Sequence, residues 1–190
     1  MAAAKSLTAQ EITKVLNYIS TKPNALRNRT MFSITTLAGC RVSEVASMTI
    51  GDVLNADGTI KTEIYFSSDR VKHGTARTVF VNQRLQAELA NYIASRAWLS
   101  STQPLFSTNR GARHAFSANT MTQHFHYLYR NAGITGASSH SGRKTFITSL
   151  AAQGISVFVL ASLAGHRSIS TTQRYVSVND DMKRRAVELL

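Results

Sequence analysis

Apolar residues recur every three or four positions along the first forty residues, as they do on the buried side of a helix. Thr8 and Glu11 form a capping-box sequence, which predicts a helix that starts at Thr8. Pro23 opens a second helix, from about Asn24 to Leu37, and Gly39 suits its end because glycine readily takes a positive φ. The predicted apolar positions of the two helices are Ile12, Val15, Leu16 and Ile19, then Leu26, Phe32, Ile34 and Leu37.

A short helix is predicted directly after Gly39, with Arg41 near its N-terminus. A cation gains nothing from the helix dipole at that end, so the position favours a functional reason for Arg41, such as anion binding. The alternative is a solvated ion pair between Arg41 and Glu44, three residues further on. The apolar side of this helix consists of Val42, Val45, Ala46 and Met48.

Residues 59–81 change character, because β-branched and aromatic residues gather in two short runs. The runs are 62–66 and 78–81, and the polar, turn-prone residues 67–77 lie between them. This pattern predicts a small antiparallel sheet whose connecting loop carries Lys72. A lysine in such a loop is more often a solvated charge than a functional group.

The second half of the chain returns to helical spacing. Its helices are predicted from Asn82 or Gln83 to about Ala97, from Ser117 to about Ala132, from Ser139 to Gly154, from Ile155 to Ala164 and from Asp180 to Leu190, with Asn179 as the last cap and a turn from Ser168 or Ser170 to Tyr175. The expected buried residues of the fourth helix are Val159, Leu160 and Leu163. The fold class predicted is therefore mainly α with one small antiparallel β-sheet (α+β), in a single domain over 1–190.

Composition indicates a class of partner only through charge. The 190 residues include 22 Lys and Arg against 10 Asp and Glu, a formal net charge of +12, which favours a polyanion such as nucleic acid. A basic protein that binds no polyanion is the alternative, and a membrane partner is not expected because no basic amphipathic helix stands out. Cys40 is the single cysteine, so no internal disulfide and no cysteine-based metal site is expected.

The N-terminus has no long apolar run, so neither a signal peptide nor a spanning segment is expected, and a reducing cytoplasm fits. The sequence has neither a Walker-type glycine loop nor an HExxH motif, which gives no sign of ATP or zinc.

Candidate chemistry is concentrated between Ser139 and Val176. This stretch contains His140-x-x-Arg143, then Gly165-His166 and Tyr175. Arginine binds phosphate oxygens with a bidentate, permanently charged fork, and histidine can hydrogen-bond phosphate or exchange a proton near neutral pH. Tyrosine can act as a nucleophile beside cations or a base, and a lysine can donate a proton to a departing alkoxide. Together these side chains suit reactions of a phosphodiester.

Each of these features is ordinary on its own. His-x-x-Arg spacing is common, Gly-His can be a helix cap with a surface imidazole, and a single tyrosine is usually half buried in a core. The ordered set carries more weight, because His166 follows Arg143 by 23 residues and Tyr175 follows His166 by nine. His124 and His126, two apart, point to different sides of a helix and make a poor metal pair.

The ordered set resembles the tyrosine recombinases, a family that includes phage integrases and DNA-inversion recombinases. The similarity runs from about residue 8 to the end of the chain. Between His140 and Arg143 the pair Ser141-Gly142 is smaller than the segment expected in that family. The matching pieces are Ala38-Gly39-Cys40-Arg41-Val42-Ser43-Glu44-Val45, Lys72-His73-Gly74-Thr75-Ala76-Arg77-Thr78-Val79, His140-Ser141-Gly142-Arg143-Lys144-Thr145-Phe146 and Leu163-Ala164-Gly165-His166-Arg167-Ser168-Ile169-Ser170-Thr171-Thr172-Gln173-Arg174-Tyr175.

The resemblance implies a role for each matching residue. Tyr175 is expected to attack DNA and form a 3′-phosphotyrosine link, freeing a 5′-hydroxyl. Arg41 and Arg143 are expected to clamp the scissile phosphate and His166 to hydrogen-bond it. Lys72 is the expected general acid, His140 a base or phosphate contact, and Glu44 a support for Arg41. The resemblance implies no cofactor and no metal. Candidate contacts to the duplex are Arg77, Lys144, Arg167 and Arg174.

The implied activity is site-specific recombination of double-stranded DNA by an assembly of several copies, such as a tetrameric synapse, with accessory DNA-bending proteins as further partners and a cytoplasmic, nucleoid-associated location. No separate N-terminal DNA-binding domain is expected in this chain, and the helix over 179–190 is expected to dock on a neighbouring protomer or on its own body. Two alternatives stay open: a DNA-binding regulator with the same fold but no strand exchange, and a type IB topoisomerase.

Overall fold

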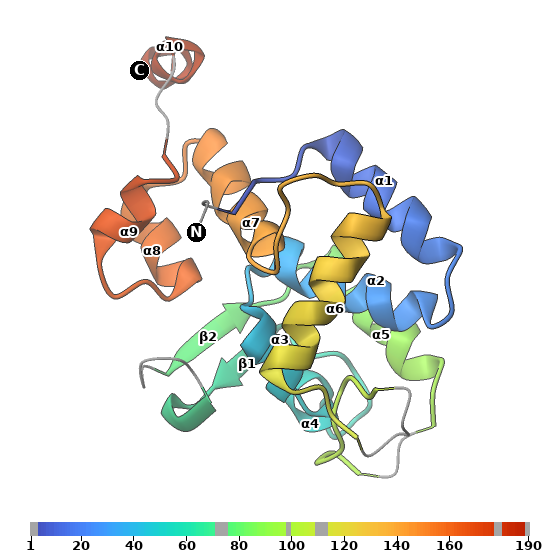
Figure 1. The fold of residues 1–190 in the computed structure, drawn as a ribbon. Coiled ribbons are helices and arrows are strands. Elements are labelled where there is room, and N and C mark those ends of the chain that lie inside the picture. Colours follow the sequence, from blue (N-terminus) through green and yellow to red (C-terminus); the bar gives the residue numbers. More distant parts are fainter. Residues whose placement is uncertain (1–3, 71–75, 98–99, 109–113, 177–179, 189–190) are drawn as a thin grey trace.

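The computed structural model describes residues 4–70, 76–97, 100–108, 114–176 and 180–188, with the side chains of Asp181 and Arg185 left aside. The described part is mostly helical with one small antiparallel sheet, as the sequence predicts (Figure 1). The elements are α1 (Ala9–Ser20), α2 (Ala25–Leu37), α3 (Val42–Ser47), α4 (Ile50–Val53), β1 (Glu63–Phe66), η1 (Ser68–Arg70), β2 (Arg77–Phe80), α5 (Gln83–Ala94), α6 (Ala118–Asn131), α7 (Ser141–Ala152), α8 (Val157–Ala164), α9 (Ile169–Gln173) and α10 (Asp180–Val187).

The first helix begins as the sequence predicts. The Glu11 backbone N–H donates to Thr8 Oγ1 at 3.2 Å, and the Thr8 N–H donates to Glu11 Oε2 at 3.0 Å. Both bonds satisfy donors that a helix start leaves without partners, so the capping box is confirmed. Val15 and Ile19 are buried on the inner side of this helix.

Helix α2 lies at the centre of the core, where α1, α3, α5 and α7 pack around it. Seven of its residues, from Asn28 to Thr35, are buried, although Leu26, an expected core position, is 43% exposed. An edge-to-face contact between Phe32 and Tyr129, with centroids 6.3 Å apart, joins α2 to α6. The end of α2 is therefore held firmly against its neighbours, and the loop with Gly39 and Arg41 leaves from that end.

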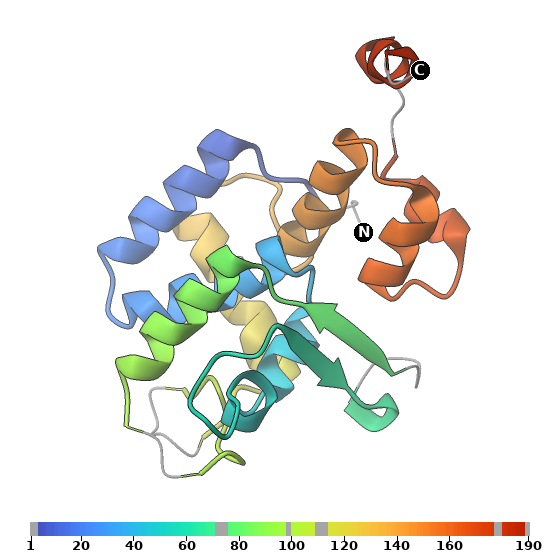
Figure 2. The ribbon, with the colours of Figure 1, turned by 180° about the vertical axis from the view of Figure 1, so that it is seen from behind.

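The two strands pair antiparallel, with Glu63 opposite Phe80 and Phe66 opposite Arg77. Ile64, Phe66 and Val79 point into the core, whereas Tyr65 and Phe80 are exposed on the outer side. This alternation is the period-two pattern of a half-buried sheet. It also turns Arg77 inward, where its side chain is only 6% exposed. Strand β2 packs against α8, as the view from behind also shows (Figure 2).

Two local expectations for the C-terminal third are wrong. Ser139 does not cap α7; the helix starts at Ser141, with His140 at the cap position and no side-chain capping bond. The Ser141 hydroxyl instead accepts from the Ser138 N–H at 2.9 Å, so the first turn closes later than predicted. Val159, expected in the core, is 49% exposed. Leu160, Ala161 and Ala164 form the buried side of α8 instead.

Smaller differences concern the ends of elements. Helix α5 ends at Ala94, three residues before the predicted end, and α8 begins at Val157 behind a Ser156 cap. The predicted cap Asn179 lies outside the described residues, but α10 is present from Asp180 to Val187. In both ribbon views α10 stands apart from the body of the molecule (Figures 1 and 2).

Candidate functional site

Glu44 is the centre of the candidate site, and its side chain is completely buried. Its Oε1 accepts from Arg41 Nη1 at 2.8 Å and from Arg77 Nε at 3.1 Å. Its Oε2 accepts from the Arg41 backbone N–H and from Arg77 Nη2, both at 2.7 Å. A carboxylate offers about four acceptor positions, so Glu44 is saturated. The alternative of a solvated Arg41–Glu44 pair is therefore wrong.

The ionised form of Glu44 depends on these partners. Burial acts to raise the pKa of its carboxyl, but the hydrogen bonds and charges of Arg77 and Arg41 outweigh burial and hold the pKa below its ordinary value. Glu44 therefore carries its negative charge at neutral pH and partly compensates the positive charges around it.

Three arginines converge on the C-terminal end of α8. Arg77 Nη1 donates to the carbonyl of Leu163 at 2.8 Å, Arg143 Nη2 donates to the carbonyl of Ala164, and Arg41 Nη2 donates to the carbonyl of Gly165 at 3.1 Å. The last carbonyls of a helix lack internal partners and carry the negative end of its dipole, so cations are favourable there. Three guanidiniums from three different segments are thus fixed side by side. The expectation that Arg41 and Arg143 gather at one place agrees with this geometry.

Arg143 is held in place from both sides. Its Nη1 donates to the carbonyl of Gly39 at 2.6 Å, and its side chain is largely buried. Burial, together with the charges of Arg41 and Arg77, lowers the pKa of this guanidinium to about 10, which leaves it charged at neutral pH. The bond to Gly39 joins α7 to the loop after α2. Because that loop also carries Arg41, Arg143 and Arg41 are held by the same segment.

Gly142 explains why the segment before Arg143 is small. A Cβ built on this glycine would lie 2.8 Å from Thr35 Cβ and closer still to Thr35 Oγ1. Helices α2 and α7 approach each other here too closely for any side chain. A larger residue at position 142 would push α7 away and move the guanidinium of Arg143 that follows it.

His166 follows Gly165, the residue that ends α8 and has a φ of +59°. Its Nδ1 lies 2.8 Å from Thr172 Oγ1, a hydroxyl on α9 that is fully buried. Burial and the nearby arginines lower the pKa of His166 to about 4, so the ring is neutral at neutral pH. Tyr175 stacks on this imidazole, with ring centroids 6.0 Å apart and 23° between the planes. Lys144 Nζ lies 5.9 Å from the centre of the Tyr175 ring.

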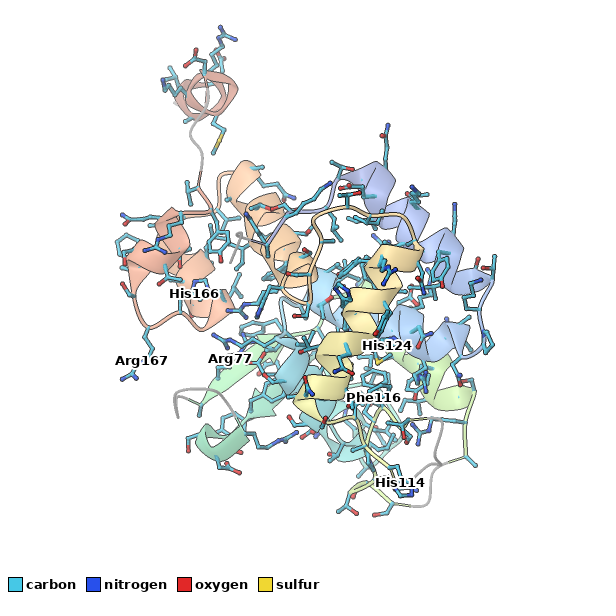
Figure 3. All side chains as sticks on the ribbon, viewed as in Figure 1. Arg77, His114, Phe116, His124, His166 and Arg167 are labelled. Carbon is cyan, nitrogen blue, oxygen red and sulfur yellow. The ribbon has the colours of Figure 1, made fainter. Side chains whose placement is uncertain are left out.

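A pocket of about 920 Å³ connects these groups. Its charged and imidazole lining consists of Arg41, Arg77, His140, Arg143, His166 and Arg167. Tyr175 does not line the pocket but lies against His166, which does. Figure 3 labels Arg77 and His166 near the end of α8, and Arg167 extending away from the loop after α8. Lys72 lies outside the described residues.

The four candidate duplex contacts differ in exposure. Arg167 and Arg174 are exposed, and Lys144 is half buried beside Tyr175. Arg77, in contrast, is buried, and its guanidinium already bonds Glu44 and Leu163. Sequence reasoning missed this support role, and also that of Thr172. The signal for Arg77 was its place two residues before Val79, on the inward side of the strand.

Three guanidiniums against one carboxylate leave a net positive charge at the pocket, which suits a phosphate-sized anion. Within the described part of the chain, no group of three or more His, Cys, Asp and Glu side chains is placed to hold a metal ion. No described helix is long and apolar enough to cross a membrane.

Comparison with known proteins agrees with the fold and the motifs. Residues 5–182 match the phage integrase family. The chain is 30% identical over 185 residues to tyrosine recombinase XerA of Pyrococcus furiosus, covering 97% of this chain and 61% of that protein. It is 31% identical over 158 residues to tyrosine recombinase XerC of Pelobacter propionicus, covering 82% of this chain and 49% of that protein. The chain thus spans about half to three fifths of these relatives.

Solved structures show the same fold. A crystal structure of XerA recombinase superposes with a TM-score of 0.75 at 24% identity and covers 100% of this chain and 66% of that one. The Tn1549 transposon integrase, solved in complex with a circular intermediate DNA, gives a TM-score of 0.79 at 20% identity, over 100% of this chain and 67% of that one. With its motifs, its fold and a family match over residues 5–182, this chain belongs to the phage integrase family of tyrosine recombinases.

Proposed function

We propose that this chain is a site-specific DNA recombinase of the integrase or invertase type, which cleaves and rejoins DNA through a covalent 3′-phosphotyrosine intermediate. The observation that carries the proposal is the placement of Arg41 and Arg143 on successive carbonyls at the end of α8, beside an imidazole on which Tyr175 stacks. Two fixed guanidiniums and a nearby phenol are what phosphotyrosine chemistry needs. The names of the relatives support the same class.

In this proposal the scissile phosphate enters the pocket of about 920 Å³. Arg41 and Arg143 each use only part of their donors on protein carbonyls and on Glu44, so further N–H groups remain for the non-bridging oxygens. Fixed donors of this kind stabilise the charge that develops in the transition state without reorganisation. Glu44 keeps Arg41 in position for this task.

The reaction is an exchange of one phosphate ester for another. The phenol oxygen of Tyr175 forms a bond to phosphorus as the bond to the 5′-oxygen breaks. Lys72 supplies the proton that the leaving 5′-oxygen takes up, and His140 receives the proton of the phenol. The 5′-hydroxyl of another strand reverses these steps and releases Tyr175. Because the phosphotyrosine ester keeps the bond energy, the cycle needs no nucleotide cofactor.

His166 contributes a hydrogen bond rather than a charge. The lowered pKa keeps its ring neutral at neutral pH, and Thr172 engages Nδ1, which leaves Nε2 for a phosphate oxygen. Tyr175 stacks on the ring and does not line the pocket, so the phenol must shift before it reaches phosphorus. The short helix α9, five residues long, is the element that would carry this shift.

The proposed partner is double-stranded DNA, attracted by the net charge of +12 and contacted by the exposed Arg167 and Arg174 and by Lys144. Several copies would assemble on the DNA, with a tetrameric synapse as the exchanging species and DNA-bending proteins as accessories. Helix α10, which stands apart from the body, would dock on a neighbouring protomer (Figure 1). The activity places the protein at the nucleoid in the cytoplasm.

The test is a nicked duplex that traps the covalent product, built from inverted repeats in the DNA beside the gene. We expect a protein–DNA adduct with wild type, mapped to Tyr175 by mass spectrometry, and none with Tyr175→Phe. Tyr127→Phe is the matched control, because Tyr127 is a tyrosine 54% exposed on α6 and away from the pocket. Binding without any adduct would favour a DNA-binding regulator, and relaxation of supercoils at undefined sites would favour a topoisomerase.

A further inference from the structure

Arg77 has a bonding pattern that neither a DNA contact nor an ordinary core residue requires. Its Nε and Nη2 bind both oxygens of Glu44, and its Nη1 binds the carbonyl of Leu163. One side chain on β2 therefore joins the start of α3 to the end of α8. The side chain of Arg77 is 6% exposed, whereas that of Arg41 is 19% exposed.

The effect of Arg77 on Arg41 follows from counting donors and acceptors. Arg41 gives Glu44 one guanidinium N–H and one backbone N–H, and gives a second guanidinium nitrogen to Gly165. Without Arg77, two acceptor positions of a fully buried carboxylate would be empty, which is unfavourable. The nearest remaining cation, Arg41, would turn its fork onto Glu44 and leave the carbonyl of Gly165 and the pocket.

The same side chain also supports the end of α8. A Cβ built on Gly165 would lie 2.7 Å from Arg77 Cδ, so the left-handed turn before His166 rests directly on the aliphatic part of Arg77. The carbonyl of Leu163 is fixed by the guanidinium at the other end of that side chain. Loss of Arg77 would therefore loosen the turn that carries His166 as well as the helix start that carries Arg41.

We infer that Arg77 is a positioning residue for the phosphate site: by sharing Glu44 and holding the end of α8, it keeps the guanidinium of Arg41 and the imidazole of His166 turned toward the pocket. The inference rests on the proposed function, and it replaces the expectation that Arg77 contacts the duplex. Through Arg77, strand β2 is joined to the helix start that carries Arg41 and to the helix end that Arg143 also bonds.

The first test separates positioning from DNA contact. In Arg77→Gln we expect the single-turnover rate of adduct formation at saturating protein to fall by about tenfold or more, the range for a lost hydrogen bond to a charged group. Affinity for uncleaved DNA should change by less than about threefold, because each guanidinium nitrogen of Arg77 already bonds Glu44 or Leu163 and not the duplex. A loss of affinity with an unchanged cleavage rate would overturn the inference in favour of a duplex contact.

Arg29→Gln is the matched control for the general cost of losing an ion pair. Arg29 also binds a carboxylate, that of Glu88, through Nε and Nη2, but it joins α2 to α5 and does not line the pocket. We expect its cleavage rate to stay within about twofold of wild type when both variants are measured well below their unfolding temperatures. Arg77→Lys keeps the charge but cannot bond both oxygens of Glu44, so an intermediate rate is expected.

A second measurement does not require any DNA cleavage. The groups that face Glu44 are Arg41 at the N-terminal cap of its helix, Arg77 on β2, Arg143 on α7 and the thiol of Cys40. Removing Arg77 leaves burial less opposed, so the carboxyl pKa of Glu44 should rise. Carbon-13 NMR of labelled glutamate carboxyls, assigned with Glu44→Gln, measures this pKa in wild type and Arg77→Gln. An unchanged Glu44 pKa would refute the inference even if no DNA substrate were found.

The cleavage rate supplies the matching pH test. In wild type Glu44 stays ionised across the neutral range, so its protonation does not lower the cleavage rate there. In Arg77→Gln the rate should fall toward acid pH as Glu44 takes up a proton and releases Arg41. A purely structural defect would lower the rate by the same factor at every pH, and that outcome would also overturn the inference. If wild type forms no adduct while the Glu44 pKa still rises in Arg77→Gln, the proposed function alone is contradicted.

Discussion

The imidazole of His166 and the phenol of Tyr175 lie stacked, with ring centroids 6.0 Å apart. The nucleophile candidate is thus held beside the proposed phosphate site and not inside it, because His166 lines the pocket and Tyr175 does not. Stacking contributes modestly to stability, so the phenol can leave this position at a small cost. The arginines, in contrast, are fixed by hydrogen bonds to backbone that a substrate does not have to break.

Alanine at Arg41 should abolish adduct formation but leave affinity for DNA within about tenfold, because one of several phosphate contacts is lost. For Arg143, which is buried, Arg143→Lys tests the same point with less risk to folding. Adduct formation on nicked duplexes and gel-shift titrations at fixed salt measure the two quantities. Cleavage at a rate near that of wild type in either variant would remove that residue from the site.

Thr172→Val should slow adduct formation by about tenfold without unfolding the protein. Valine fills the fully buried space of Thr172 but cannot hydrogen-bond Nδ1 of His166, so the imidazole loses the contact that orients it. Thr13→Val, at an exposed position on α1 that does not line the pocket, is the control. An unchanged rate in Thr172→Val would show that the orientation of His166 does not depend on this bond.

Gly142→Ala should lower the free energy of unfolding by about 1–3 kcal/mol, the cost of overpacking a close helix contact. The added Cβ would overlap Thr35 on α2. Urea unfolding of Gly142→Ala, Thr35→Ala and the double variant measures the effect. Because Thr35→Ala removes the hydroxyl nearest to the new methyl, the double variant should recover part of the loss. Strict additivity of the two changes would contradict this packing explanation.

Acid should destabilise the fold through two histidines. The pKa values of His124 and His166 are both lowered to about 4, chiefly by burial. The unfolded chain, with histidine pKa values near 6.5, binds more protons between about pH 6.5 and 4, so stability falls as the pH drops through that range. His124→Gln should remove about 2 kcal/mol of this pH dependence, after a discount for partial exposure. Unfolding temperatures at pH 7 and pH 5 measure it, with His126→Gln as the exposed control.

Truncation after Val176 should leave the unfolding temperature unchanged within about 2 °C, because α10 stands apart from the body and buries little apolar surface against it. Assembly on DNA should be reduced if α10 docks on a neighbouring protomer. Calorimetry and sizing of the DNA complexes measure the two effects. A clear drop in unfolding temperature would show instead that the helix docks on its own body in solution.

Much of this arrangement was predictable from local sequence. The Thr8–Glu11 capping box, the positive φ of Gly39 and the two β-rich runs of the hairpin each depend on neighbours in the chain. Such signals are local, so the sequence contains them in full. The motif order then indicated that Arg41 and Arg143 belong together, as their shared helix end confirms.

The misses arise where tertiary contacts decide the outcome. Val159 lies on the apolar pattern of α8, but the buried side of that helix is set by Leu160 and Ala164. Arg77 was predicted as a contact to the duplex because its buried partner, Glu44, lies 33 residues away in the chain. The close helix contact at Gly142 could not be predicted for the same reason, since its near neighbour Thr35 is on another helix. No local pattern specifies such pairs.

The three arginines donate hydrogen bonds to successive carbonyls at the end of α8, and this sets a strict limit on the length of that helix. One inserted residue would turn everything beyond it by about 100° and shift it by about 1.5 Å along the axis. All three guanidiniums would then face the wrong oxygens together, so this helix tolerates substitution on its outer side far better than any change in its number of residues.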